Sequence, residues 1–390
     1  MTGRNKTAVE FRNVDIMFGE NPGRALELLD QGGTRESILA ETGSVLGVAG
    51  ATLSVGVGEI CVLMGLSGSG KSTLLRAVNG LNKVTRGEVL VQDADRMIDV
   101  VSCDSRTLRQ MRMERIAMVF QQFALLPWRT VSENVGLGLE LRGVEISERE
   151  RIVHEKLKLV DLDKWADKFA HELSGGMQQR VGLARAFATD AEILLMDEPF
   201  SALDPLIRTH LQDELLDLQR SLKKTIIFVS HDLDEALKIG NHIAIMEGGH
   251  IVQYGEPEDI ILNPADDYVR DFVSHVNPLN VLSGTSVMTP IGERTGDIEL
   301  DRTGHVRLRL SADGSPEGVS IDGQDGRLVD GSSDPQTVCT APPGITIREA
   351  IEWRQLTGNP VVLIEDGKAV GYIGDDEILN ALVGRAKGIQ

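Results

Sequence analysis

Cysteine is scarce in this chain of 390 residues, which contains only Cys61, Cys103 and Cys339. Three scattered cysteines form no disulfide framework, so we expect a reducing, cytosolic compartment. No apolar run approaches the ~20 residues that a membrane-spanning helix needs, and residues 1–10 lack the apolar core of a signal peptide. We therefore expect a soluble or peripheral protein. The eight histidines include no His-x-x-x-His pair, which excludes a zinc-protease motif.

Basic residues are too few to balance the acidic ones. The chain has 40 Lys and Arg against 59 Asp and Glu, which gives a net charge of −19. This balance argues against a broad nucleic-acid groove or a face for anionic lipids, so we expect no nucleic-acid partner. The rest of the composition is ordinary, with 41% hydrophobic residues, and predicts packed domains rather than disorder. The length predicts two or three of them.

A glycine-rich stretch after an apolar run is the strongest motif. The run Ile60–Met64 predicts a buried strand, and residues 72–79 predict a helix. The stretch between them has the spacing of a phosphate loop, in which glycines let backbone N–H groups approach an anion. The Lys71 ammonium can reach β- and γ-phosphates, and the Ser72 hydroxyl can bind Mg²⁺. The predicted phosphate-binding residues are Gly65, Leu66, Ser67, Gly68, Ser69, Gly70, Lys71, Ser72 and Thr73.

Two further motifs indicate catalytic or binding residues, and each is also typical of an ordinary helix start. Asp197 and Glu198 follow an apolar strand, where Asp197 can hold Mg²⁺ and Glu198 can orient an attacking water. An acidic pair at this place is also typical of a helix N-terminus. The segment 173–180 opens a helix that Ser174 can cap, and Gly175 and Gly176 expose amides. Alone it predicts a helix start; beside a phosphate loop it predicts a second anion site, presented to the nucleotide of a partner copy.

The order of apolar segments predicts an α/β core with a largely parallel sheet, because strands alternate with helices. Residues 19–47 interrupt two strand-like segments and predict an insertion, in which Thr34 caps a short helix that Gly43 ends. Composition shifts after about residue 275. Residues 311–336 are rich in Gly, Ser, Asp and Pro and predict loops or a weakly ordered linker. A helix, two strands and a second helix are expected from residue 347 to 382.

Together these motifs resemble the ATP-binding subunits of ATP-binding-cassette (ABC) transporters, over about residues 8–275. The resemblance implies a Walker A loop at Gly65–Thr73, a Walker B strand at residues 194–198 and the family signature at residues 173–178. Phe18 stands where the family has an aromatic residue that stacks on adenine. The remaining implied roles are catalysis by Lys71, Gln121, Glu198 and His231; Mg²⁺ binding by Ser72, Gln121 and Asp197; contact with the partner's ATP by Ser174, Gly175, Gly176 and Gln178; and coupling of the two subunits by Ser201 and Asp204.

The same resemblance implies partners. Two copies would enclose two ATP molecules with Mg²⁺ between them, and hydrolysis would reopen the homodimer. The apolar segment Phe123–Trp128 is expected to be exposed and to grip integral membrane permease subunits. A periplasmic substrate-binding protein would be an indirect partner, and the chain would sit on the cytoplasmic face of the inner membrane. Details at residues 62–67, 101–104, 127–129 and 202–208 resemble importers of quaternary amines such as choline, glycine betaine and proline betaine.

The expected fold is an ABC-type P-loop NTPase core with a helical subdomain at about 122–190 and an antiparallel β part, spanning residues 1–275. Residues 276–390 resemble a degenerate cystathionine-β-synthase (CBS) module. In that family a Ser or Thr stands three residues before an acidic one, and here Gly374 and Glu377 take those places. A dimerising appendage is an equal interpretation of this tail. The alternatives for the whole chain are an importer ATPase for another solute, a cassette ATPase without a transport role, and a ligand sensor dominated by its tail.

Overall fold

The computed structural model describes residues 6–277, 279, 281–331 and 334–382. Its contacts divide the chain into two compact units, Met1–Glu256 and Pro257–Gln390. We predicted a boundary near residue 275; instead the helices Pro257–Leu262 (α10) and Asp267–Val273 (α11) group with the second unit. None of the helices in the described ranges is long and apolar enough to cross a bilayer.

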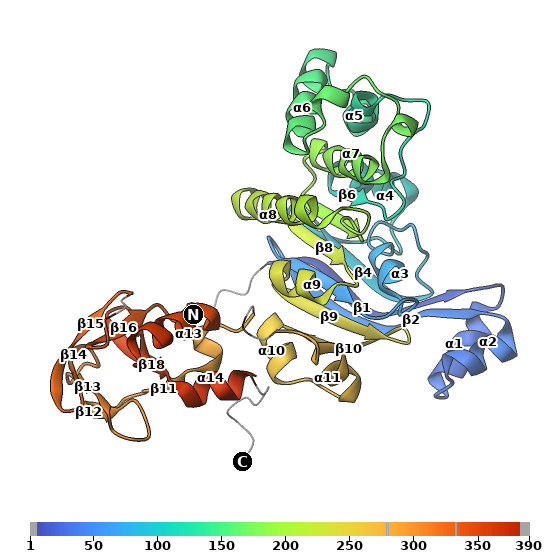
Figure 1. Cartoon of the computed structure of the whole chain (residues 1–390). Helices are drawn as coiled ribbons and strands as arrows, with labels where there is room; N and C mark the ends of the chain where they lie inside the picture. The colour runs from blue at the N-terminus through green and yellow to red at the C-terminus, as the bar shows by residue number, and fades with distance from the viewer. Residues whose placement is uncertain (1–5, 278, 280, 332–333, 383–390) are drawn as a thin grey trace. The chain divides into compact units, whose positions relative to one another are not determined.

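The first unit contains a six-stranded sheet in the order β10-β9-β3-β8-β7-β6. Its strands β6, β8, β9 and β10 are labelled in Figure 1. Neighbours are parallel except β9 and β10, which form a hairpin. Strands β3, β7 and β8 are buried at every residue, as their continuous apolar runs require for a sheet covered on both faces. The strands are Ile60–Met64 (β3), Ile116–Val119 (β6), Ile193–Asp197 (β7), Thr225–Val229 (β8), His242–Glu247 (β9) and His250–Gly255 (β10).

Because these strands are parallel, their carboxyl ends meet at one edge of the sheet. The helices Lys71–Leu75 (α3), Pro205–Leu222 (α8) and Leu233–Ile239 (α9) follow β3, β7 and β8 in the chain. The loops at the ends of β3, β6, β7 and β8 therefore come together, although they are far apart in the sequence. Ser105–Glu114 (α4) precedes β6 and begins at Asp104, whose carboxylate accepts a hydrogen bond from Thr107 N.

An antiparallel sheet in the order β2-β1-β4-β5 completes the β structure of this unit, as predicted. Its strands are Thr7–Phe18 (β1), Val45–Gly56 (β2), Arg86–Asp93 (β4) and Arg96–Asp99 (β5). One apolar core joins it to the parallel sheet, with Phe11, Val55 and Val89 packed in the same cluster as Leu63 and Ile227. The predicted insertion forms Pro22–Asp30 (α1) and Arg35–Thr42 (α2) between β1 and β2. Thr34 caps α2 and Gly43 ends it with a φ of +68°, which confirms both predictions.

The predicted helical subdomain consists of Val131–Leu141 (α5), Ile146–Leu159 (α6) and Gly175–Ala188 (α7), with two 3₁₀ turns between α6 and α7. The three helices pack against one another in every pairing (Figure 1). A capping box fixes the start of α5, where the Thr130 hydroxyl and the Glu133 carboxylate each accept from the other's backbone N–H. This subdomain carries the predicted signature segment at the N-terminus of α7.

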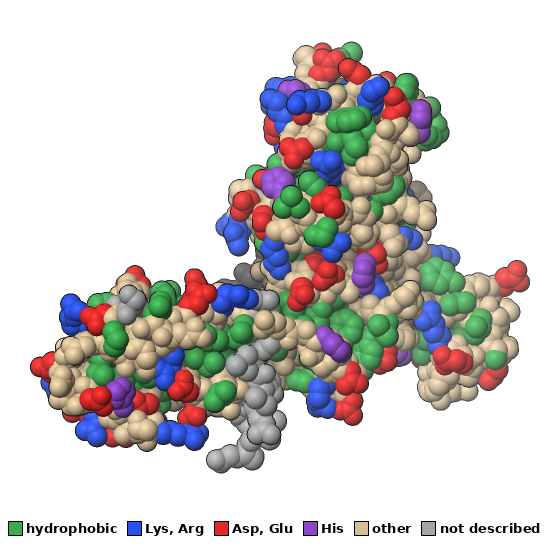
Figure 2. Space-filling view, viewed as in Figure 1, with side chains coloured by type: hydrophobic (Ala, Val, Ile, Leu, Met, Phe, Trp, Pro, Cys, Tyr) green, Lys and Arg blue, Asp and Glu red, His purple; other side chains and the backbone are tan. Residues whose placement is uncertain are grey.

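The second unit is built on an eight-stranded sheet in the order β11-β18-β17-β16-β15-β14-β13-β12. On the face visible in Figure 2, acidic and basic side chains are intermingled over its strands β12–β15. The strands are Thr289–Pro290 (β11), Gly296–Glu299 (β12), Val306–Leu310 (β13), Pro316–Ile321 (β14), Gln324–Val329 (β15), Thr337–Ala341 (β16), Val361–Glu365 (β17) and Lys368–Ile373 (β18). The helices besides α10 and α11 are Gly284–Val287 (α12), Ile347–Thr357 (α13) and Asp375–Leu382 (α14).

The prediction of loops at residues 311–336 was wrong. Strands β14 and β15 lie there and continue an antiparallel meander from β12 and β13. The Gly and Asp residues that suggested a linker form its tight turns: Asp322 and Gly323 have φ values of +50° and +77°, as a two-residue hairpin turn requires. Alternate residues of β13, Val306, Leu308 and Leu310, are buried in the core of this unit. The last eight residues lie outside the described part of the chain.

Candidate active site

The phosphate loop leaves β3 in a conformation that only glycine allows. Gly65 has a φ of +139°, and a Cβ there would lie 2.1 Å from the Met246 carbonyl oxygen. Gly70 has a φ of +104°, and its Cβ would lie 2.4 Å from the Gly47 carbonyl oxygen. Helix α3 begins at the next residue, Lys71. The loop is therefore packed tightly between the start of β2 and the end of β9.

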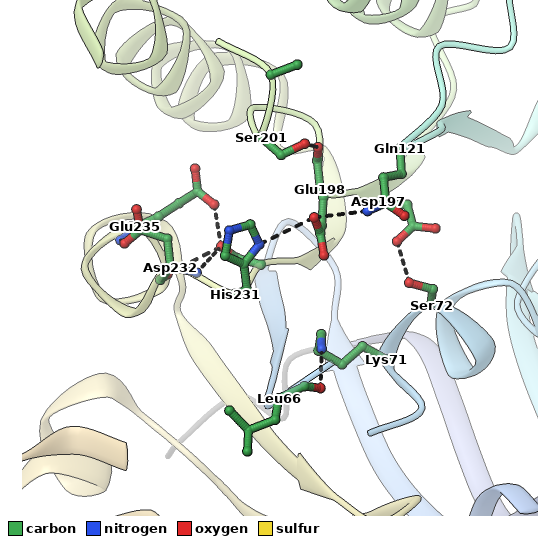
Figure 3. Close-up of polar contacts among 12 residues, drawn as sticks. Leu66, Lys71, Ser72, Gln121, Asp197, Glu198, Ser201, His231, Asp232 and Glu235 are labelled. Atoms are coloured by element: carbon green, nitrogen blue, oxygen red, sulfur yellow. Dashed lines mark hydrogen bonds and ion pairs between the residues drawn. The ribbon is translucent and has the colours of Figure 1, made fainter. Parts of the chain in front are cut away.

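Lys71 points back along its own loop. Its ammonium donates to the Gly65 carbonyl oxygen at 2.8 Å. It also donates to the Leu66 carbonyl oxygen at 2.9 Å (Figure 3). Burial lowers the pKa of Lys71, and the nearby carboxylates of Glu198 and Asp197 act in the opposite direction. The Lys71 ammonium is thus held inside the phosphate loop, within reach of a phosphate that binds there.

Asp197 ends β7 and is fully buried. One carboxylate oxygen accepts from the Ser72 hydroxyl at 2.7 Å, and the other accepts from the Arg76 guanidinium at 2.8 Å. Two of the three residues predicted to bind Mg²⁺, Ser72 and Asp197, are therefore adjacent, although 125 residues separate them. A carboxylate beside a hydroxyl is the hard-oxygen set that Mg²⁺ prefers, so these residues fit the ion. Sequence reasoning missed Arg76, because nothing in its helix indicates that partner.

Glu198 is the meeting point of three strand ends. Its Oε2 lies 3.2 Å from Gln121 Nε2 and 3.3 Å from His231 Nδ1 (Figure 3). Gln121 follows β6, Glu198 follows β7 and His231 follows β8, so adjacent parallel strands deliver the three side chains. The Glu198 backbone has a φ of +48°, a conformation that costs a non-glycine residue energy and depends on its surroundings. The structure thus joins three of the four residues that sequence analysis assigned to catalysis, while the fourth, Lys71, bonds its own loop.

A buried glutamine that sequence analysis did not single out supports Glu198. Gln179 of α7 is 1% exposed, and its amide donates to the Glu198 carbonyl oxygen at 3.0 Å. Its amide oxygen accepts from Ala202 N at 3.1 Å. The Ser201 hydroxyl also donates to the Glu198 carbonyl, at 3.0 Å. The glutamine pair at 178 and 179 gave no signal, because the sequence does not tell which one turns inward.

The predicted signature residues form the start of α7 and bond within their own segment. The Ser174 hydroxyl caps α7 by accepting from Met177 N at 3.4 Å, as predicted. Gln178 donates to the Leu173 carbonyl at 3.1 Å, and Gly175 and Gly176 form the first turn. Within the described ranges, no hydrogen bond joins these residues to Gly65–Thr73. Asp204 caps α8 by accepting from Ile207 N at 3.1 Å.

Phe18 is the last residue of β1 and is 41% exposed. Its ring lies against Gly47: a Cβ at residue 47 would be 2.7 Å from the ring and 3.1 Å from the Thr73 methyl. The ring therefore lies beside the start of α3, on the surface, where an aromatic that stacks on a base has to be.

The segment Phe123–Trp128 is exposed only in part. Trp128 is 70% exposed, while Phe123, Leu125 and Leu126 are half-buried. Polar side chains of α5 and α7 hold its backbone: Asn134 bonds both Leu126 N and O, and Arg185 donates to the carbonyls of residues 123 and 124. Hydrogen bonds thus hold the backbone of this segment in place, and the Trp128 side chain is exposed at its end.

Comparisons with known proteins agree with this geometry. A family model for the ABC transporter matches residues 48–201. The chain is 50% identical to the glycine betaine/proline betaine transport system ATP-binding protein ProV of Escherichia coli (strain K12), over 73% of this chain and 70% of that one. It is 41% identical to the glycine betaine/carnitine transport ATP-binding protein GbuA of Listeria monocytogenes serotype 1/2a, over 96% and 98%.

Among solved structures, the chain is similar to the dimeric ATP-binding cassette MJ0796 in a post-hydrolysis state bound to ADP and Pi. That comparison has a TM-score of 0.56 and 31% identity, and it covers 64% of this chain and 98% of the cassette. A second structure of the same cassette, described as a dimeric bacterial ABC transporter cassette, gives 0.56 and 30%. The chain belongs to the ABC transporter family, within the group of glycine betaine/proline betaine transport ATP-binding proteins.

Proposed function

We propose that this chain is the ATP-hydrolysing motor subunit of an importer for quaternary amines, with glycine betaine, proline betaine or choline as the transported solute. The observation that carries the proposal is the cluster at Glu198, where Gln121 and His231 flank one carboxylate beside the pair Asp197 and Ser72. The names of the relatives at 41–50% identity support the solute class.

Each residue of the cluster has a proposed task that its position supports. Lys71 exchanges the carbonyls of Gly65 and Leu66 for phosphate oxygens when ATP enters the loop. Ser72, Asp197 and Gln121 would hold Mg²⁺, which when bound would neutralise charge on the phosphates. Glu198 orients and polarises the attacking water, and His231 contacts the γ-phosphate. Because Gln121 and His231 both touch the Glu198 carboxylate in this structure, a γ-phosphate would enter between groups already in place.

The nucleotide site is completed by a second copy of the chain. The backbone amides of Gly175 and Gly176 in the first turn of α7, with Ser174 and Gln178, would contact the ATP held by the partner's loop. In the described ranges no hydrogen bond joins them to the loop of their own chain, which supports this trans arrangement, as do the dimeric relatives. Ser201 and Asp204 lie between Glu198 and α8, where a partner's approach could be transmitted to the catalytic carboxylate.

The partner in the membrane would be an integral permease subunit that docks on Phe123–Trp128, at the cytoplasmic face of the inner membrane. Trp128 offers the exposed aromatic side chain that interfaces favour. A periplasmic binding protein would deliver the solute to that permease. A relative named for trimethylamine N-oxide transport, at 41% identity and 85% coverage of its length, makes another methylated amine the second candidate solute.

For the second unit we propose one complete CBS-like repeat rather than two. The succession β16, α13, β17, β18 and α14 supports one repeat, whereas the β12–β15 meander replaces most of the other. Glu377 is buried and accepts hydrogen bonds from Gly374 N at 2.9 Å and from the Thr289 hydroxyl. Because its carboxylate is engaged inside the chain, a dimerising role suits this unit better than adenosine binding.

Transport tests the proposal directly. The chain is reconstituted in vesicles with its permease and binding protein, and uptake of labelled glycine betaine and choline is compared with that of trimethylamine N-oxide. Lys71→Ala should abolish ATP-dependent uptake because it removes the charge that reaches the phosphates. Glu198→Gln should abolish uptake and turnover but retain ATP binding. Uptake that persists in both variants would contradict the motor role.

The identity of the accumulated solute separates the two candidates. Uptake of trimethylamine N-oxide alone would replace the assignment of the solute and leave the ATPase role intact.

A further inference from the structure

The insertion between β1 and β2 packs against the first unit through an apolar core of its own. Its apolar side chains Ala25, Leu28 and Ile38 are buried in one cluster with Met17 of β1 and Leu46 of β2. Buried apolar area of this kind holds short helices that would not form alone. The insertion therefore has a defined place on the antiparallel sheet.

A charged contact fixes the insertion at a second point. Arg86 of β4 binds both carboxylate oxygens of Asp30, at the end of α1, at 2.8 Å each. The same guanidinium donates to Asp15 of β1 at 2.6 Å, and Asp15 in turn accepts from Gly50 N at 2.7 Å. A bidentate pair sets the relative orientation of its two side chains as well as their distance. The end of α1 is therefore held against β4 of the sheet.

From this fixed loop, Arg35 reaches the phosphate loop. It is the first residue of α2, directly after the capping Thr34, and its side chain is half-buried. Its guanidinium donates to the Gly68 carbonyl oxygen at 2.7 Å. The donor and the acceptor lie 33 residues apart in the sequence, with β2 and β3 between them.

The carbonyl groups of the phosphate loop show why this contact matters. Lys71 takes the carbonyls of Gly65 and Leu66, Gly249 N takes that of Ser69 at 3.1 Å, and Arg35 takes that of Gly68. Lys71 has to leave its carbonyls to bind phosphate. The contacts from outside the loop that stay are then Gly249 N on Ser69, the Asn82 amide, which donates to the Thr73 carbonyl at 3.0 Å, and Arg35 on Gly68. Thr73 already lies in α3, so Arg35 is the side chain that, among the described contacts, bonds the loop ahead of that helix.

The insertion also touches the opposite end of the site. In the structure it lies between Phe18, the last residue of β1, and Val45, the first residue of β2, and these two residues pair. The ring of Phe18 rests on Gly47, two residues further on, whose carbonyl borders Gly70 of the phosphate loop. One insertion is thus connected to the aromatic residue proposed for the base and to the loop proposed for the phosphates.

We propose that the insertion forms one side of the nucleotide site and that Arg35 is its positioning residue. Arg35 keeps the Gly68 carbonyl turned outward, so the loop stays shaped for phosphate after Lys71 leaves, and it adds a positive charge beside the phosphates. The inference rests on the proposed function, in which this loop binds ATP. It assigns to the insertion a role in nucleotide affinity rather than in the chemical step.

Binding of Mg-ATP and Mg-ADP to the full chain, measured by calorimetry, tests this role. Removing one charge-assisted hydrogen bond and its charge in Arg35→Ala should raise both dissociation constants about tenfold. The KM for ATP should rise with them, and kcat should stay within about twofold, because Arg35 does not touch the Glu198 cluster. Arg35→Lys keeps the charge and should recover part of the affinity. Higher salt should reduce the difference in nucleotide dissociation constant between the wild type and Arg35→Ala, because salt screens the charge of Arg35.

The matched control is Arg24→Ala. Arg24 lies in the same insertion and pairs only with the exposed Glu27, at 2.7 Å, among the contacts described. It should leave nucleotide affinity unchanged. The proposal is overturned if Arg35→Ala binds nucleotide as Arg24→Ala does, or if it lowers only the melting temperature. Loss of binding in Arg35→Ala with normal binding in Lys71→Ala would instead contradict the proposed function, because the loop itself would not be the ATP site.

Discussion

Replacing Gln179 with leucine should slow hydrolysis without weakening ATP binding. Leucine has a similar volume and suits a side chain that is 1% exposed, but it removes the bonds to the Glu198 carbonyl and to Ala202 N. Glu198 would then keep its position through Ser201 and through its own N–H, which donates to the Val229 carbonyl at 3.1 Å. The perturbation thus reaches the catalytic carboxylate through its backbone alone.

The magnitude follows from the bonds that are lost. Each net hydrogen bond contributes about 1 kcal/mol, so Gln179→Leu should destabilise the fold by about 2 kcal/mol. The left-handed conformation of Glu198, with its φ of +48°, costs about 1–3 kcal/mol and persists only while its surroundings hold it. If about 1.4 kcal/mol of this support is lost from the transition state, kcat falls about tenfold.

Steady-state ATPase assays and chemical unfolding check both numbers. We expect the KM for ATP to stay within about twofold, because Gln179 bonds no residue of the phosphate loop in the described structure. Gln179→Glu separates the two bonds: its carboxylate can still accept from Ala202 N but cannot donate to the Glu198 carbonyl. It should therefore lose kcat as the leucine variant does. A leucine variant that is less stable but turns over at the wild-type rate would refute the positioning role.

Two further predictions concern the base and the buried acid. Phe18→Ala should raise the KM for ATP about tenfold, because base stacking on an aromatic ring is worth roughly 1–3 kcal/mol. Phe18→Tyr should keep the KM for ATP of the wild type. An unchanged KM in Phe18→Ala would exclude stacking of this ring on the base. Burial raises the pKa of Glu235, whose carboxylate accepts from Ser230 and Gln212. A raised pKa in the folded state stabilises the fold below the unfolded value near 4.5 and loses that stability as the pH rises through the folded pKa. Glu235→Gln should therefore flatten the pH dependence of the unfolding free energy above that value, and an unchanged slope would assign the dependence to other groups.

The local motifs of this protein could be predicted from the sequence because their residues are neighbours in the chain. The phosphate loop needs only a strand, glycines at Gly65 and Gly70 and a following helix, and all of these are contiguous. The caps at Thr34 and Ser174 are set within three residues by hydrogen bonds to their own helices. The apolar run before Asp197 and Glu198 also indicated that these two residues lie at the carboxyl end of a strand, as β7 shows.

The linker prediction at residues 311–336 failed for a physical reason. Gly, Asp and Ser favour tight turns and weakly ordered segments alike, and composition does not distinguish the two. The difference is made by the strands between the turns, which find a buried face only when Val306, Val319 and Val338 share one core. That core exists only after the sheet has assembled.

The sequence by itself therefore determined the parts of the nucleotide site that lie next to each other along the chain, together with the order of strands and helices that carry them. Tertiary structure alone decided the partners of Arg35, Arg76 and Gln179, which bond groups 33, 121 and 19 residues away. A side chain with several donors can bond many groups of the right chemistry. Which one it meets depends on the order of strands in the sheet and on the packing of the helices, and neither is written in any local stretch of the chain.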